Sequence, residues 1–519
     1  MTNLRYNLLD EPLIRVSPLG AMTLPGLLAA LAQDEVEGIP ALRPHQLPFW
    51  HMFLVQLAAL ALHGAGEREI PEDEPTWKGL LRRLTPQFPD DEPWCLLVED
   101  WSKPAFMQPP VPVGVQMKNP VPSPDGLDLL ITSKNHDLKQ AIARNGAVED
   151  WLFALVSLQT GEGYGGAGNQ GIARMNGGSS SRPMLTLAPL PGSPERGLPP
   201  RAGAWFARDV RVLIETRDDI LEQSPLDYRA DHGLGLIWLA PWPEGEQLQI
   251  AELDIWFIEV CRRVRLVMAE DGRITGCKDT SRMTRIEAKH LKGVLGDPYA
   301  PVHKTENKSF TLSGGDFDYR TVTELFLSGN WVRPLLAQTT PFEGNGATLA
   351  LVAAALARGN SKTEGFKSRM IPVGGQISRA IGPKRAELHR LAQAQMETIA
   401  LFDKALRDAL VLAAAKGERD RIKKELYGFT NTARDHLDRY AEDQALRAEE
   451  DLFTRLLWER TQTIFDEALP AMPCADLFRP RAEARARRRL YFAVRKAYPD
   501  LFPDATTPNM DEENANDAS

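Results

Sequence analysis

The C-terminal part of the chain constrains the fold most, because four consecutive stretches there repeat apolar residues at helical spacing. The four stretches are 384–416, 418–441, 443–469 and 475–497. Steps of three and four residues give each helix a single apolar stripe that must pack against a neighbour. Gly417 stands where a helix C-cap belongs, and Pro470 and Pro473 separate the third stretch from the fourth. We therefore predict an antiparallel four-helix bundle over 379–500.

The preceding 378 residues have a mixed character. Residues 45–62 and 147–160 read as apolar helices, and closely spaced prolines between 104 and 126 predict an extended connector. The apolar run at 349–356 is expected to be a packed helix. Strand-like runs lie at 210–214 and 234–239. The prediction is an α+β chain, with a mixed, loop-rich N-terminal domain over 1–378 followed by the bundle.

The net charge of −9 gives little guidance about nucleic-acid binding, because it is unevenly distributed. The segment from 504 onward holds five acidic residues and no Lys or Arg, so more than half of the net charge lies there. We expect 501–519 to be a disordered acidic tail. Local basic patches decide whether DNA can dock, so an acidic average does not exclude it.

The sequence predicts a cytoplasmic protein without a metal. We expect no membrane span, because the apolar run 347–357 stops at Arg358, and charges interrupt the first 16 residues. The four cysteines, which lack a CxxC pair, are expected to be buried, reduced thiols. They are Cys95, Cys261, Cys277 and Cys474. No cofactor motif is recognised, and a zinc site would need closely spaced Cys/His pairs.

A glycine-rich segment directly follows the helix predicted at 147–160. Eight of the 18 residues from 161 to 178 are glycine, among them Gly163, Gly165 and Gly166. Such a backbone can approach a partner closely and bind phosphate or enter a narrow groove. It ends in no Gly-Lys-Ser/Thr and follows a helix, so it is neither a Walker A loop nor a dinucleotide fingerprint. A set of tight surface turns is the alternative interpretation.

Three further groups carry charge. The segment Lys134-Asn135-His136-Asp137 could serve metal binding or base catalysis, or be a polar loop. A basic group around Asn360-Ser361-Lys362 could contact phosphate, or be a solvated surface. The same choice applies to arginines predicted on the last helix. These include Arg481, Arg485, Arg488 and Arg489.

The order of several motifs resembles the large, CasA-like subunit of the type I-E CRISPR surveillance complex, Cascade. NLLDEPLIRV opens the chain, PAFMQPP follows, and DLLITSKNHD precedes a helix and a GYGG loop. RMNGGSSSRP, GDPYAPV with Trp331, KALRDAL and HLDRY continue the same order. The resemblance rests on the sequence of these segments over the whole chain rather than on any one motif.

This resemblance implies a non-catalytic subunit that recognises the protospacer-adjacent motif (PAM) of double-stranded DNA, mainly from the minor groove. It also implies that the subunit starts strand separation and recruits a helicase-nuclease. The implied partners are other Cascade subunits, CRISPR RNA, target DNA and that helicase-nuclease, with no membrane. The PAM preference itself cannot be predicted from these residues.

The resemblance also assigns site residues. The DNA- and PAM-binding residues would be Gly163, Gly165, Gly166, Lys289, Lys292, Asn360, Ser361 and Lys362. The residues that dock the subunit onto the complex would be Lys134, Asn135 and His136. The family's duplex-splitting wedge carries a Gln, whereas this chain has Ser361 at that place, so Lys362 is the candidate substitute. Cysteine pairs that some members carry are missing, which again predicts no metal.

Two other functions remain open from the sequence. A structural assembly subunit would use the bundle for docking and make no DNA contact. A metal-dependent nuclease would use His136, Asp137 and scattered carboxylates.

Overall fold

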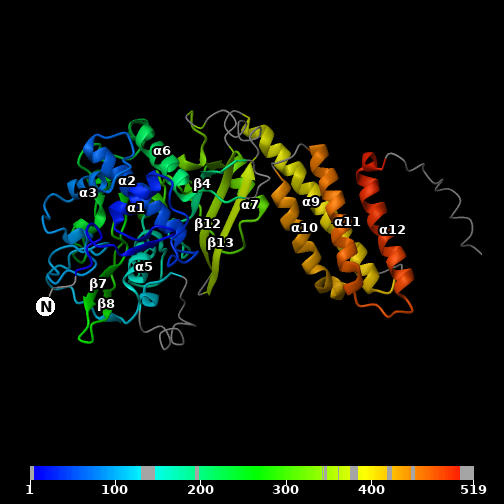
Figure 1. Cartoon of the computed structure of the whole chain (residues 1–519), viewed down its shortest axis with the longest axis horizontal. Helices are drawn as coiled ribbons and strands as arrows, with labels where there is room; N and C mark the ends of the chain where they lie inside the picture. The colour runs from blue at the N-terminus through cyan, green and yellow to red at the C-terminus, as the bar shows by residue number, and fades with distance from the viewer. Residues whose placement is uncertain are drawn as a thin grey trace, which may run out of the picture. The chain divides into compact units, whose positions relative to one another are not determined.

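The computed structural model describes residues 5–129, 146–192, 198–341, 343, 348–359, 362–373, 384–417, 424–445 and 450–502. The chain divides into two compact units, Met1–Ala386 and Glu387–Ser519 (Figure 1). The boundary expected from the sequence, after residue 378, falls eight residues before this division.

The N-terminal unit is built around a buried helix, α2 (Leu47–Ala65). Among the described residues of this unit, the other α-helices are α1 (Leu24–Ala32), α3 (Glu74–Arg83), α5 (Val148–Gly161), α6 (Ala202–Gln223) and α7 (Tyr319–Leu327). Helix α2 is long and apolar enough to cross a bilayer, contrary to our expectation, but 83% of its apolar window is buried inside the protein. It therefore behaves as a core helix, and most of its apolar residues are buried, although Leu47 at its start is exposed.

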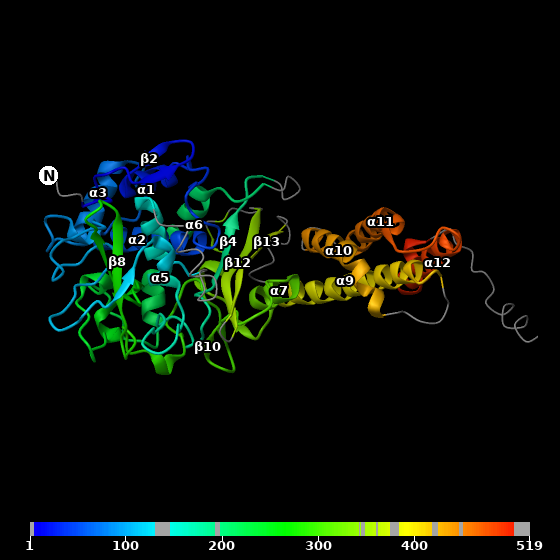
Figure 2. The ribbon, with the colours of Figure 1, turned by 90° about the horizontal axis from the view of Figure 1, so that it is seen from below.

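Small sheets surround these helices (Figures 1 and 2). The strands are β1 (Ile14–Val16), β2 (Gly20–Met22), β3 (Asn119–Val121), β4 (Met184–Pro189), β5 (Leu234–Leu236), β6 (Leu253–Ile258), β7 (Arg263–Met268), β8 (Ile274–Asp279), β9 (Val302–His303), β10 (Lys308–Ser309), β11 (Trp331–Val332), β12 (Leu349–Gly359) and β13 (Lys362–Val373). The three-stranded sheets have the orders β13-β12-β4, β3-β8-β7 and β10-β9-β11, and β1-β2 and β5-β6 form two-stranded sheets. The β5-β6 pair is parallel and all the others are antiparallel.

Two sequence predictions in this unit are wrong. The run 349–356 is not a helix but strand β12, because it pairs with β13 on one side and β4 on the other. A central strand buried on both faces is as continuously apolar as a buried helix, so periodicity does not distinguish them. The run 210–214 is not a strand but part of α6, where Phe206, Val210 and Leu213 form one buried helical stripe.

The C-terminal unit is helical, as predicted. Its helices are α9 (Arg385–Ala414), α10 (Asn431–Gln444), α11 (Glu450–Ala468) and α12 (Arg479–Ala497). They lie side by side in Figures 1 and 2, and Phe402 of α9 packs against Trp458 of α11. Helix α10 is shorter than expected, because the 3-10 helix Lys424–Thr430 precedes it. The mixed unit and the helical unit together form an α+β chain.

The cysteine prediction is only half right. Cys95 and Cys261 are buried, and burial raises the pKa of each thiol to about 12. Cys277 and Cys474 are partly exposed. All four are free thiols.

Candidate nucleic-acid interface

The glycine-rich segment forms a loop that folds back on itself after α5. The amide of Gly165 donates to the carbonyl of Asn169 at 2.9 Å, and the amide of Asn169 donates to the carbonyl of Gly166 at 2.9 Å. The amide of Tyr164 donates to Gly178 at 2.9 Å, which ties the loop to its own returning arm. We call residues 163–171 the glycine loop and residues 172–182 the return arm.

The three predicted glycines of this loop have different structural roles. A Cβ on Gly163 would lie 2.1 Å from the carbonyl oxygen of Ser180, so this position must be glycine for internal packing. Gly166 has φ +109° and no atom within 4 Å of its Cβ position, so its backbone conformation favours glycine while the space around it is open. Gly165 is exposed, and its Cβ would be 3.2 Å from a guanidinium nitrogen of Arg262. Only Gly165 and Gly166 offer backbone to an outside partner.

The loop also presents side chains that the sequence analysis missed. Tyr164, 42% exposed, stands at its start. Arg282 is exposed beside its far end, where the Gln170 side chain donates to the Arg282 carbonyl at 3.3 Å and the Ser281 amide donates to Gly168 at 2.9 Å. Arg262 lies beneath the loop and donates to the Gly163 carbonyl at 3.3 Å. Tyr164 belongs to the GYGG motif, but no motif marks Arg262 or Arg282, because only the fold brings their segments to the loop.

A lysine, also missed, is partly buried near the loop. Lys278 of β8 donates to the Gly126 carbonyl at 3.3 Å. Burial, and then the neighbouring charge of Arg262, lower the pKa of Lys278. No local pattern in the sequence of β8 indicates this neighbour, because the fold brings Gly126 to Lys278.

Lys289 and Lys292 are both exposed, in and just after the 3-10 helix Lys289–Leu291. The Lys292 carbonyl accepts the amide of Ser309 at 3.1 Å. The Ser309 carbonyl in turn accepts the side-chain amide of Asn176, in the return arm, at 2.8 Å. The structure therefore ties Lys292 and the glycine loop to one framework, through Ser309 and Asn176.

Arg358 joins three chain segments at the base of the loop. Its guanidinium forms an ion pair with Glu162, the residue immediately before the glycine loop, and donates to the Leu129 carbonyl at 2.7 Å. Both ion-paired side chains are largely buried. Arg358, which directly follows the apolar run 349–357, is thus neither a free phosphate contact nor a solvated surface residue. Its side chain links β12, the end of α5 and the segment that ends at Leu129.

Several predicted site residues lie outside the described residues. Lys134, Asn135 and His136 are among them, as are Asn360 and Ser361. Lys362 begins β13 and pairs with Gly359 in the hairpin register. Of the three predicted wedge residues, Lys362 is thus the one whose backbone the structure describes.

The predicted arginine face of the last helix is divided among internal contacts. Arg485 donates to the Gly417 carbonyl, Arg487 pairs with Asp466, and Arg489 lies 3.5 Å from Asp408. These arginines hold the C-terminal unit together and are not a single free basic surface.

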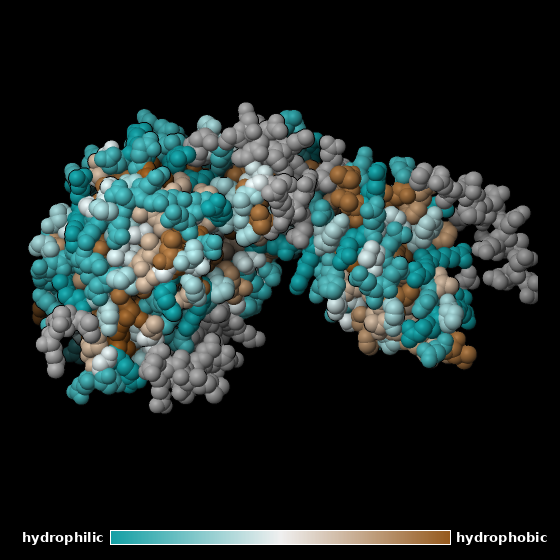
Figure 3. Space-filling view, viewed as in Figure 1, coloured by the Kyte–Doolittle hydropathy of each residue, from teal (hydrophilic) through white to brown (hydrophobic). Residues whose placement is uncertain are grey.

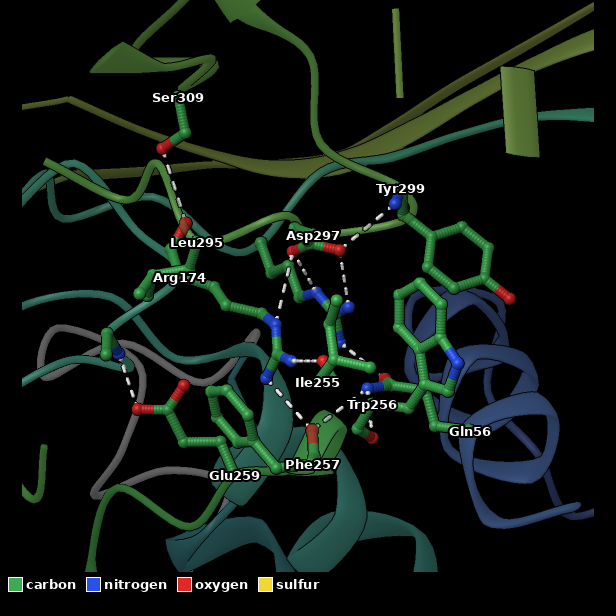
Figure 4. Close-up of polar contacts among 12 residues, drawn as sticks. Gln56, Arg174, Ile255, Trp256, Phe257, Glu259, Leu295, Asp297, Tyr299 and Ser309 are labelled. Carbon is green, nitrogen blue, oxygen red and sulfur yellow. Dashed lines mark hydrogen bonds and ion pairs between the residues drawn. The ribbon is translucent and has the colours of Figure 1, made fainter. Parts of the chain in front are cut away.

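A buried polar network supports the return arm (Figure 4). Arg174 donates to the carbonyls of Phe257 (3.0 Å) and Ile255 (3.4 Å) in β6 and stacks on the Phe257 ring. Glu259 accepts the amide of Ala173 at 2.5 Å. Ser309, which anchors Lys292, donates its hydroxyl to the Arg174 carbonyl at 3.3 Å.

Asp297 completes this network. It forms a two-bond ion pair with Arg182 at 2.6 and 2.7 Å. Burial alone would raise the pKa of Asp297, but the charges of Arg182 and Arg174 outweigh burial and hold that pKa below its usual range. Burial raises the pKa of Glu259 to about 7, against the lowering effect of Arg174. The return arm is thus fixed by buried charges at both ends, Ala173–Arg174 and Arg182.

Within the described residues, no group of three or more His, Cys, Asp or Glu side chains is placed to hold a metal ion. His136 and Asp137, the centre of the nuclease alternative, lie outside those residues. What the described site offers chemically is exposed backbone, one tyrosine and several cations. Groups of these kinds contact phosphates and groove edges in nucleic-acid interfaces.

Solved structures identify the fold. Cse1 from Acidimicrobium ferrooxidans superposes with a TM-score of 0.61 at 12% identity, covering 97% of this chain and 100% of that one. CasA from Thermus thermophilus gives 0.58 at 17% identity, with 95% and 100% covered. A chain of a CRISPR RNA-guided surveillance complex gives 0.55 at 14% identity, with 94% and 100% covered.

No protein-family model and no curated protein sequence matches this chain. The class that the fold defines is a two-unit α+β protein. Its particular form is that of the Cse1 (CasA) proteins, with which the chain shares its architecture over nearly its whole length. The resemblance noted in the sequence motifs is therefore confirmed at the level of the fold.

Proposed function

We propose that this chain is the non-catalytic large subunit of a type I-E CRISPR surveillance complex and recognises the PAM of double-stranded DNA. The observation that carries the proposal is the arrangement around the glycine loop. Backbone at the exposed Gly165 and the partly exposed Gly166 is held on the same framework as Lys292 and beside Arg282. The likeness to a chain of a CRISPR RNA-guided surveillance complex supports the same assignment.

The physical argument begins with the groove. The minor groove is narrow and shows a degenerate pattern of base edges, so backbone without side chains can approach it and tolerate several sequences. Gly165 and Gly166 provide such backbone on the described surface. Cations at the edge of the loop would contact the flanking phosphates, which position the protein without reading sequence.

The next step is strand separation, for which the hairpin β12-β13 is the candidate. Its turn follows Arg358, which is anchored to Glu162 at the foot of the glycine loop. In our proposal the turn, with Ser361 and Lys362, opens the duplex next to the recognised base pairs. Unstacking costs a few kcal/mol per step and would be repaid by guide RNA pairing with the freed strand.

In this proposal the chain acts in the cytoplasm with the other subunits and CRISPR RNA. The segment Lys134–His136 would help to dock it onto the complex. The chain would then recruit the helicase-nuclease that cleaves the target. The chain itself supplies recognition and no catalysis.

The test measures the binding of the reconstituted complex to duplexes with a matched target and randomised flanking bases, with and without this chain. We expect selection of particular flanking bases only when the chain is present. Gly165→Val should abolish this selection, because it puts a side chain into the approach surface with ordinary backbone geometry. Gly79→Ala, at an exposed glycine of α3 with open space around it, is the matched control.

Charge variants separate DNA reading from a purely structural role. Lys289→Gln combined with Lys292→Asn should weaken binding to all sequences and reduce the slope of log K against log salt by about one or two. Arg68→Gln, at an exposed arginine after α2, is the control. Unchanged affinity and slope in the double variant would favour the assembly subunit without DNA contact. Cleavage of nucleic acid by the purified chain with Mg²⁺ or Mn²⁺ would instead favour the nuclease alternative.

A further inference from the structure

The N-terminal unit contains a cavity of about 990 Å³ that the proposed DNA interface does not use. It lies between the start of α2, the start of α6 and the end of α1, with Leu31, Leu54 and Phe206 in its buried wall. No residue of the glycine loop lines it. Its volume is at the upper end of the range for ligand cavities, so it has room for more than one side chain.

The inner wall of the cavity is largely aromatic. Trp50 and Trp205 line it, and their indole nitrogens are occluded from solvent. The His51 ring packs against the Trp205 ring with 4.2 Å between centroids, and its Nε2 is 2.9 Å from a carboxylate oxygen of the fully buried Asp209. The imidazole is therefore part of a fixed wall, and the cavity accepts an apolar group.

The mouth carries three leucines that are unusually exposed. Leu19, Leu47 and Leu198 are 41%, 48% and 48% exposed, and they come from the β1-β2 turn, the start of α2 and the segment before α6. Figure 3 shows that hydrophobic surface on the drawn face of the molecule is broken into small patches among hydrophilic residues. Three exposed leucines around one cavity differ from this pattern and indicate a binding surface. Burying them under a partner would stabilise the complex by about 25 cal/mol per Å² of apolar surface removed from water.

The rim of the cavity is acidic. Asp34, Glu35 and Glu37 line it, and Glu35 and Glu37 are exposed. Arg201 is the one Lys or Arg among the described lining residues, and it pairs with Asp34 at 2.9 Å. The remaining negative charge of Glu35 and Glu37 repels nucleic-acid phosphates and acidic peptides and attracts a cationic partner.

We propose that this cavity is the docking site for a short segment of a partner protein that carries adjacent apolar side chains flanked by Lys or Arg. The apolar side chains would enter between Trp50 and Trp205 and cover the exposed leucines. The flanking cations would meet Glu35 and Glu37. This mode uses a buried apolar anchor with a charged rim, as peptide-binding grooves do.

The test uses the full chain and fluorescent six-residue peptides, with fluorescence anisotropy as the readout. The probe has two leucines flanked on each side by two lysines. One control peptide replaces the lysines with glutamates, and a second replaces the leucines with Gly-Ser. We expect each control peptide to bind at least about tenfold more weakly than the probe, because each lacks one of the two recognition features.

Exposed variants of the chain locate the site without disturbing the core. Glu35→Lys/Glu37→Lys should weaken the probe about tenfold, and Leu47→Ser/Leu198→Ser should weaken it similarly. The matched control is Glu67→Lys/Glu69→Lys, which reverses two exposed glutamates with the same spacing after α2. The proposal is overturned if the probe does not bind, if the glutamate peptide binds equally well, or if both charge-reversal pairs have the same effect. None of these outcomes bears on DNA binding, so this proposal and the PAM proposal fail separately.

Discussion

Glu162 and Arg358 form an ion pair across 196 residues of sequence and thereby fasten the hairpin β12-β13 to the foot of the glycine loop. The pair is largely buried, and the Arg358 guanidinium also donates to Leu129. The hairpin, the glycine loop and the segment that ends at Leu129 are therefore linked through the Arg358 side chain. Loss of this ion pair should therefore both destabilise the N-terminal unit and change the geometry of the proposed interface.

Arg358→Gln should lower the free energy of unfolding by about 2–4 kcal/mol, because it leaves the Glu162 carboxylate buried without its partner. Chemical denaturation of the full chain measures this loss. Adding Glu162→Gln to the first change should recover part of it, because the orphaned charge is then removed. If the double variant were less stable than Arg358→Gln, the unpaired Glu162 carboxylate would not be the main cause of the loss.

Gly163→Ala and Gly165→Ala should differ sharply, although the two glycines are two residues apart. The new methyl group at 163 would lie 2.1 Å from the Ser180 carbonyl oxygen, so backbone must move, at a cost of about 1–3 kcal/mol. The methyl group at 165 meets the flexible end of Arg262 at 3.2 Å and should cost less than about 0.5 kcal/mol. Thermal unfolding of the two variants makes the comparison, and equal losses would contradict this division of roles.

The sequence predicted the elements whose signal is local. Helices α2 and α5 form where the predicted apolar runs 45–62 and 147–160 lie, with Pro48 accommodated in the first turn of α2, and the four C-terminal stretches repeat a helical stripe. It failed at β12, where the buried apolar run acquires its strand geometry from β4 and β13. No local pattern could show those partners, which lie at 184–189 and 362–373.

The candidate site was predictable only in part, for the same reason. The glycine cluster is visible in the sequence, but the roles of Gly163 and Gly166 depend on Ser180 and on backbone angles. Arg282 lies beside the loop because its carbonyl accepts the Gln170 side chain and the neighbouring Ser281 amide donates to Gly168, and no motif encodes these contacts. Likewise, a basic residue such as Arg358 cannot be recognised as internal until its buried partner is known.

The turn after α9 offers a separate test in the C-terminal unit. Gly417 has φ +71°, its amide donates to the Leu412 carbonyl at 2.9 Å, and a Cβ would lie 3.0 Å from the Ala482 Cα. Gly417→Ala should therefore cost about 1–2 kcal/mol, through the left-handed backbone and the close approach of α12. Calorimetry of the variant beside Gly79→Ala, which has open space in α3, checks this expectation. A neutral Gly417→Ala variant would show that α12 can move away.

Glu259 should make the stability of the N-terminal unit fall as pH rises from about 4.5 to about 7. Burial raises the pKa of Glu259 to about 7 in the folded chain, against 4.5 as its ordinary value. Between these values the folded state holds a proton that the unfolded state has released. Folding therefore takes up a proton in this window. The free energy of unfolding then falls by about 1.4 kcal/mol for each pH unit of increase, or by about 3 kcal/mol over the window.

Glu259→Gln isolates this effect, because glutamine stays neutral but keeps an oxygen that accepts the Ala173 amide. We expect a flatter dependence of the free energy of unfolding on pH in the variant. Denaturant titrations followed by tryptophan emission report on this unit, which holds ten of the eleven tryptophans. Burial raises the pKa of Asp438, in the other unit, to about 6, and that group contributes equally to both proteins. The difference between the two curves therefore belongs to Glu259, and parallel curves would show that its carboxyl group keeps its ordinary pKa in the fold.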